Sequence, residues 1–220
     1  MRELWVRVAP SLREDEKKKL ISTTVEMCNA YIVDPKDVES ARKNGAKKIV
    51  TTSGSGDVLL VENVDDVFKA KKENKAVCAV VTVKSKQDEK EIIRMAEASV
   101  DYIAARCQDW KVIPLENLIA QTHGKNKLLA LAANAQEAKL ALETLEIGAD
   151  GLVMETSDIE EIKKVNDALK QIRSRAAEAE AAEKVPLCAA QVVEVKPLGS
   201  GARVCIDTVS YTHLTLPTKR

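Results

Sequence analysis

The segment at residues 109–120, DWKVIPLENLIA, places a lysine, a proline, a glutamate and an asparagine directly after an apolar run. A lysine such as Lys111, when buried among apolar groups, can act as a base or form a Schiff base with a carbonyl. A simpler interpretation also fits. Pro114 is suited to the first turn of a helix, and Glu116 near that helix start is favoured by the helix dipole. From the sequence alone both interpretations stay open.

Other residues with chemical potential also stand where apolar runs end. Asp34 fits a helix cap as well as an active-site carboxylate. The glycine-rich stretch TTSGSGD (51–57) could let a backbone approach a phosphate, although a flexible turn explains it equally well. His123 is a weak acid/base candidate, or a helix end together with Gly124. The run-end residues are Arg7, Asp34, Thr51, Thr52, Glu62, Lys84, Arg106, Lys111, Glu116 and Glu155.

The elements that must position these residues alternate between short apolar runs and amphipathic helical runs. Most of the apolar runs are apolar on both faces, as is typical of parallel strands covered by helices. The strand candidates are residues 4–9, 30–34, 47–52, 57–63, 76–83, 101–107, 127–133 and 150–156. This alternation predicts an α/β fold, a (β/α)8-barrel-like domain, in which the carboxyl ends of the strands form the working face.

The link between the third and fourth strands is the weak point of this prediction. Only SGSG (53–56) joins them, which is too short for a crossover helix. We therefore expect either an irregular barrel or a hairpin of these two strands, and an open doubly wound sheet is the alternative fold.

Composition limits the kinds of partner. The chain has 34 Lys+Arg and 34 Asp+Glu, so no net field would gather nucleic acid or an anionic membrane. No apolar run reaches the roughly 18 residues that a membrane span needs. The five cysteines are scattered without CxxC spacing, which favours reduced thiols in a cytoplasmic protein and indicates no metal site. We expect a small-molecule partner.

The end of the chain follows another pattern. We expect a barrel-like catalytic domain over residues 1–184 and the first strands of a β-rich domain over residues 185–208. The last stretch, VSYTHLTLPTKR (209–220), resembles a translated sequencing-adapter tail. The expectation is therefore a fragment of a longer protein.

Four segments, in order along the chain, carry a family resemblance: LWVRV (4–8), LLVEN (59–63), WKVIPLENLIA (110–120) and QVVEVKPLGSGARVCIDT (191–208). Together they resemble the archaeal-type, class II 3-dehydroquinate synthases. The resemblance implies NAD-dependent oxidative deamination of 2-amino-3,7-dideoxy-D-threo-hept-6-ulosonate. The product then cyclises by an intramolecular aldol step to 3-dehydroquinate, in the shikimate route to aromatic amino acids.

The resemblance also implies roles for particular residues. Arg7 or Arg106 would hold the substrate carboxylate. Lys111 and Glu116 would serve the aldol closure, and Asn117 would donate an amide. The further catalytic candidates are Lys84, Asp34 and Glu155.

The cofactor NAD poses a separate question, because the chain has no GxGxxG after a strand. Either the strand-end loop holds the pyrophosphate or a C-terminal domain contributes the site. The loop candidates are Thr52, Ser53, Gly54 and Gly56.

Two rival readings remain open. One is a barrel aldolase or lyase without NAD, with a Schiff base on Lys84 or Lys111. The other is an inactive truncated barrel whose exposed edge pairs with further chains, and a homo-oligomer is compatible with either enzyme reading.

Overall fold

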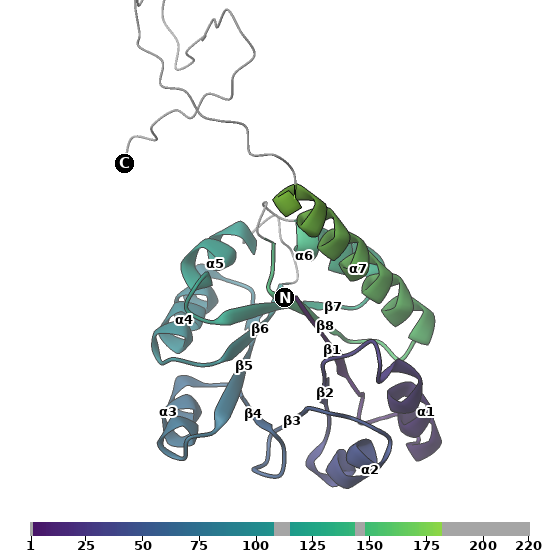
Figure 1. Cartoon of the computed structure of the whole chain (residues 1–220). Coiled ribbons are helices and arrows are strands. Elements are labelled where there is room, and N and C mark those ends of the chain that lie inside the picture. Colours follow the sequence, from purple (N-terminus) through teal and green to yellow (C-terminus); the bar gives the residue numbers. More distant parts are fainter. Residues whose placement is uncertain (1, 108–114, 144–147, 182–220) are drawn as a thin grey trace, which may run out of the picture. The chain divides into compact units, whose positions relative to one another are not determined.

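The computed structural model describes residues 2–107, 115–143 and 148–181 (Figure 1). Eight strands pair in parallel and in sequence order, and β8 closes on β1. The predicted barrel is therefore confirmed, and the open sheet is wrong. The strands are β1 Glu3–Arg7, β2 Ala30–Ile32, β3 Ile49–Thr51, β4 Val58–Val61, β5 Ala76–Val83, β6 Tyr102–Cys107, β7 Lys127–Ala132 and β8 Gly151–Met154.

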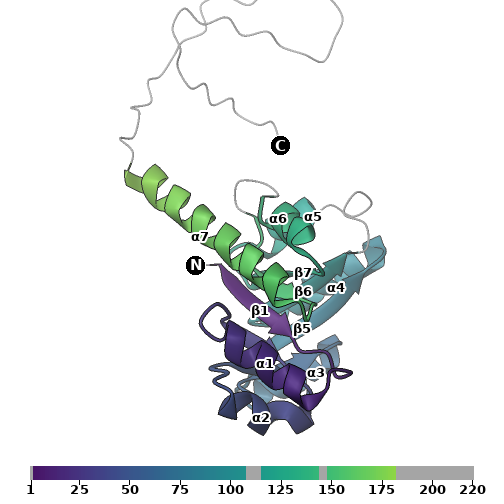
Figure 2. The ribbon, with the colours of Figure 1, turned by 90° about the vertical axis from the view of Figure 1, so that its right-hand side faces the viewer.

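The helices lie outside the ring of strands, and Figure 2 shows β1 with α1 and α7 beside it. None of the helices in the described part of the chain is long and apolar enough to cross a membrane. The predicted domain pieces at 185–208 and 209–220 lie outside the described residues. The helices are α1 Glu14–Thr24, η1 Pro35–Asp37, α2 Val38–Lys43, α3 Val64–Lys72, α4 Lys86–Glu97, α5 Leu115–Thr122, α6 Ala135–Glu143 and α7 Ile159–Ala181.

The link between β3 and β4 contains no helix, yet the two strands are parallel, with Val50 opposite Val58. The hairpin alternative is therefore wrong and the irregular barrel is confirmed. The physical reason is the length of β3. Because that strand has three residues, a short link can run back along it. The Asp57 N–H donates to the Ile49 carbonyl at 2.8 Å, and the Asp57 carboxylate accepts from the Ile49 N–H at 2.7 Å.

Gly56 lets this link pack directly on the strand that a helix would otherwise cover. A Cβ at Gly56 would lie 2.7 Å from Thr51 Cγ2 and 2.9 Å from the Ile49 carbonyl oxygen, closer than real Cβ atoms come. Asp57 also accepts from Arg42 of α2 at 3.0 Å, which fastens the link to a neighbouring helix. The glycine is therefore explained by close packing.

The core has two layers, which follow from the alternation of side chains along each strand. One layer lies between the strands and the helices and includes Leu4, Val6, Leu20 and Ile92. The other consists of strand residues alone and fills the barrel interior. Its buried members are Trp5, Ala30, Ile32, Val50, Val58, Leu60, Cys78, Ala104, Leu129, Leu131 and Val153.

The amino-terminal end of the barrel interior is closed by a charged cluster. Glu3 accepts from Trp5 Nε1 at 2.8 Å and from Lys127 Nζ at 2.6 Å, and Lys48 Nζ lies 3.5 Å from the same carboxylate. Lys48 also donates to the Tyr102 hydroxyl at 3.1 Å. Burial opposes ionisation of Glu3, but the hydrogen bonds from Lys127 and Trp5 and the two lysine charges hold its pKa below the usual range.

Candidate active site at the carboxyl end of the barrel

Arg7, Arg106 and Glu155 come together at the carboxyl end of the barrel. Arg7 Nη1 donates to Glu155 Oε1 at 3.1 Å, and Arg106 Nη2 donates to the same oxygen. The arginine side chains are 38% and 39% exposed and that of Glu155 is 23% exposed. The group, here called the Arg–Glu–Arg cluster, is therefore open to a ligand.

The strand register explains this meeting. The three residues stand two positions after Trp5, Ala104 and Val153, which point into the barrel, so their own side chains continue the inward rows. The Glu155 N–H donates to the Ala132 carbonyl at 2.9 Å and extends the pairing of β8 with β7. Beneath the cluster lies a buried apolar floor, formed by Ile32, Leu60, Leu131 and Val153.

The cluster has donor capacity to spare. A guanidinium group carries several N–H donors in a planar fork. Within the described residues, Glu155 is the ion-pair partner of both Arg7 and Arg106, and each arginine reaches it through one nitrogen. Two arginine charges against one carboxylate leave one surplus positive charge. The arrangement can therefore bind a carboxylate through the remaining donors.

Among the residues that the structure describes, neither Asp34 nor Lys84 forms an ion pair with a member of this cluster. Asp34 caps η1 by accepting from the Lys36 N–H at 3.4 Å, so the helix-cap interpretation is confirmed. Lys84 is exposed, without the burial that a Schiff-base lysine requires. Asn117 is exposed on α5, and the side chain of Glu116 and all of Lys111 lie outside the described part of the structure.

The four residues expected to hold NAD occupy the link between β3 and β4. Thr52 directly follows the strand and is exposed, and the Ser53 hydroxyl lies 2.6 Å from that of Ser55. Gly54 faces the Lys75 side chain, and Lys75 immediately precedes β5. Gly56 packs on Thr51. The link therefore turns back toward the amino-terminal end of the strands after Thr52.

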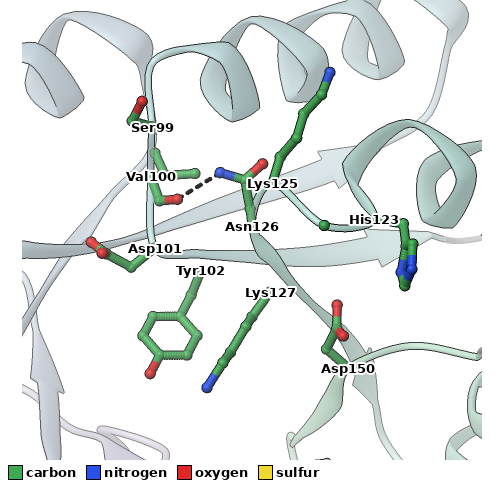
Figure 3. Close-up of a pocket in the computed structure, with 10 residues that line it drawn as sticks. Ser99, Val100, Asp101, Tyr102, His123, Lys125, Asn126, Lys127 and Asp150 are labelled. Carbon is green, nitrogen blue, oxygen red and sulfur yellow. Dashed lines mark hydrogen bonds between the residues drawn. The ribbon is translucent and has the colours of Figure 1, made fainter.

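A pocket of about 540 Å³ lies at the opposite end of the barrel, where β6, β7 and β8 begin (Figure 3). Its carboxylates already bind the chain. Asp101 accepts from the Val77 N–H at 2.8 Å and from Lys71 at 2.7 Å, and Asp150 accepts from the Leu128 N–H at 2.9 Å. Because parallel barrels place their chemistry at the carboxyl ends, we assign this pocket to the support of the strand starts.

His123 lines the same pocket. Gly124, next to it, has φ +76° just beyond the end of α5, which is the conformation of a glycine at a helix end. The helix-end interpretation of His123–Gly124 is confirmed. The acid/base candidate consequently lies at the end of the barrel opposite to the Arg–Glu–Arg cluster.

Sequence reasoning found the three members of the cluster but did not pair them, because Glu155 lies 148 residues from Arg7 and 49 residues from Arg106. It missed the charged cluster at the amino-terminal end. The available signal was a charged residue at or just before the start of an apolar run, namely at Glu3, Lys48 and Lys127.

Comparison with known proteins identifies the family. The family model described as "3-dehydroquinate synthase II N-terminal domain" matches residues 1–169. A relative from Methanobrevibacter smithii, named 3-dehydroquinate synthase, is 36% identical over 91% of this chain and 58% of its own length. One of the same name from Methanocaldococcus jannaschii is 36% identical over 96% of this chain and 57% of its own length. The chain thus spans a little under three fifths of these relatives.

Solved structures agree on the fold. The 3-hexulose-6-phosphate synthase of Salmonella typhimurium matches with a TM-score of 0.59 and 17% identity, over 77% of this chain and 99% of that one. The orotidine 5'-monophosphate decarboxylase of M. jannaschii matches with a TM-score of 0.60 and 15% identity, over 78% and 98%. At these identities the likeness concerns the barrel alone. The family match and the archaeal relatives together show that this chain belongs to the 3-dehydroquinate synthase II family.

Proposed function

We propose that this chain is the barrel part of a 3-dehydroquinate synthase that acts in aromatic amino-acid biosynthesis. The proposed reaction is the NAD-dependent oxidative deamination of 2-amino-3,7-dideoxy-D-threo-hept-6-ulosonate, followed by cyclisation to 3-dehydroquinate. The names of the archaeal relatives support the pathway. The observation that carries the proposal is the Arg–Glu–Arg cluster at the carboxyl end of the barrel.

The cluster complements the reacting end of this substrate, which is an α-amino acid. The Arg7 and Arg106 guanidinium groups offer donors to the carboxylate next to the amino-bearing carbon. Glu155, between them, offers a carboxylate to the ammonium group. In this arrangement Glu155 is placed to take the proton that the nitrogen must lose before the carbon is oxidised.

NAD, when bound, supplies the hydride acceptor for that oxidation. The fit of the described residues to a dinucleotide is poor, because Gly56 and Asp57 are committed to packing on β3. Thr52, at the strand end, is the member of the loop set that faces the carboxyl end of the barrel. We therefore propose that the NAD site is completed by the part of the family's length that this chain does not span.

Ring closure needs a base next to the ketone and a donor to the developing oxyanion. For these roles we retain Lys111 and Glu116 as proposals, with Asn117 as the amide donor. Asn117 is on the first turn of α5, which begins at Leu115. Asp34, which caps η1, and Lys84, which is exposed, stay catalytic candidates to which the proposal assigns no step.

The test is an activity assay on the whole M. jannaschii relative, with Arg→Gln substitutions at the positions aligned with Arg7 and Arg106. Formation of NADH and 3-dehydroquinate would be followed together. Each substitution should raise KM for the amino-ulosonate and leave the affinity for NAD unchanged. Substitution at the position aligned with Glu97, an exposed carboxylate at the end of α4, serves as the control.

Two results would contradict the proposal. The first is unchanged KM in both arginine variants. The second is trapping of a substrate adduct by borohydride without NAD, since that result would favour the lysine-dependent aldolase.

A further inference from the structure

The inference concerns the charge of the ligand that the Arg–Glu–Arg cluster accepts. It rests on the proposed function in one respect, because that function names the carboxylate that the cluster would bind. The starting observation is that Arg7 and Arg106 approach from β1 and β6 and meet on the same oxygen of Glu155.

Without Glu155, the two arginines would form a doubly positive site of the kind that binds phosphate groups. With Glu155 in place, one of the two charges is cancelled. The surplus is a single positive charge, which matches one carboxylate. A phosphate monoester, which is close to a dianion above pH 7, would be left with an uncompensated negative charge next to Glu155.

The position of Glu155 makes this cancellation hard to avoid. Its backbone is hydrogen-bonded to Ala132 of β7, so the residue cannot leave the barrel mouth without breaking the strand pairing. Its side chain is 23% exposed, less than those of the two arginines. A ligand that reaches the guanidinium groups therefore meets the glutamate charge as well.

We propose that Glu155 is a specificity-determining residue that restricts the cluster to singly charged carboxylates and rejects phosphate dianions. For the proposed reaction this means that the barrel selects an unphosphorylated amino-keto acid over phosphorylated sugars of similar size. Removal of the glutamate charge should convert the cluster into a phosphate site.

The experiment uses the 220-residue chain and two probes with the same three-carbon skeleton, glycerate and glycerol 3-phosphate. Binding at pH 8 would be measured by calorimetry or by ligand-observed NMR. The wild-type chain should bind glycerate more tightly than glycerol 3-phosphate. Glu155→Gln should improve glycerol 3-phosphate binding by about tenfold, roughly what one charge interaction near a protein surface provides, and change glycerate binding much less.

Three further variants decide between charge and other causes. Glu155→Asp keeps the charge and should keep the preference for glycerate, even if the side chain repacks. Glu97→Gln removes a charge from the exposed last residue of α4, on the side where the strands begin, and should leave both affinities unchanged. Arg7→Gln should weaken the binding of both probes.

Two outcomes would overturn the proposal. The first is an equal gain in glycerol 3-phosphate binding in Glu155→Gln and Glu97→Gln, and the second is loss of the preference for glycerate in Glu155→Asp. Failure of the proposed function would look different. In that case the whole relative would make no 3-dehydroquinate, while the order of probe affinities in the chain would still follow the charge at position 155.

Discussion

Lys17 Nζ of α1 lies 2.7 Å from Asp37 Oδ2 of η1, and both side chains are almost completely buried, at 7% and 12% exposure. The pair ties the first helix to the segment that follows β2. Burial of two charges is costly, and their mutual attraction offsets that cost only while both partners are present.

Replacement of one partner should therefore be more damaging than replacement of both. We expect Lys17→Met to lower the free energy of unfolding by about 3–5 kcal/mol, because it leaves the Asp37 carboxylate buried without a partner. The double variant Lys17→Met/Asp37→Leu should recover most of that loss. Urea denaturation would measure both.

Lys18→Met is the matched control for this pair, since it makes the same change at an exposed position of the same helix. It should alter stability by well under 1 kcal/mol. A double variant as unstable as the single one would show that the loss does not come from an unpaired buried charge.

The packing of Gly56 on Thr51 gives a second prediction. Gly56→Ala should destabilise the chain by about 1–3 kcal/mol, because the new methyl group meets a strand backbone oxygen and a buried side chain. Gly54→Ala is the control. A Cβ there would meet chiefly the flexible end of Lys75, at 3.1 Å, which can move away. Equal losses of stability in the two variants would argue against close packing as the reason for the glycine.

The strands of the barrel could be predicted because parallel strands buried on both faces have a distinctive apolar pattern. The prediction of 76–83 coincides with β5. The prediction of 47–52 was too long, since β3 spans Ile49–Thr51. The parallel link after β3 could not be predicted, since it depends on how Gly56 packs against a strand of three residues.

The site was predictable in its members but not in its geometry. Each of Arg7, Arg106 and Glu155 could be placed at a strand end. Their contact, however, requires closure of the barrel between β8 and β1, which no local pattern encodes. The loop at 52–57 was harder to interpret from the sequence. A glycine-rich pattern looks the same whether the loop holds a ligand or packs on a strand, as Gly56 does here.

The charged cluster at the amino-terminal end predicts a dependence of stability on pH. The pKa of Glu3 is lowered in the folded chain, so its ionised form stabilises the fold. That contribution is fully present above the unfolded pKa, about 4.3, and is lost as the pH falls through the lower folded value. Glu3→Gln should therefore be less stable than the wild type at pH 7, and the difference should shrink below about pH 4.

Denaturant unfolding of both proteins between pH 7 and pH 3 would test this sign. Glu62→Gln, which changes an exposed carboxylate, should show no such convergence with the wild type. A Glu3→Gln difference that stayed constant across the acid range would mean that packing of the side chain, and not its charge, supports the barrel end.

The last prediction separates the charge of the two arginines in the candidate site from their shape. Arg7→Lys and Arg106→Lys keep the positive charge but replace a planar fork with a point charge on a flexible stem. If the substrate carboxylate is held by paired N–H donors, each substitution removes one charge-assisted hydrogen bond worth about 1.5–3 kcal/mol, or roughly a 10–100-fold rise in KM. Made at the aligned positions of the M. jannaschii relative, the lysine variants should therefore resemble the Arg→Gln variants in KM for the amino-ulosonate. Lysine variants with wild-type KM would show instead that the barrel mouth attracts its substrate by charge alone, without the fork geometry that Arg7 and Arg106 present around Glu155.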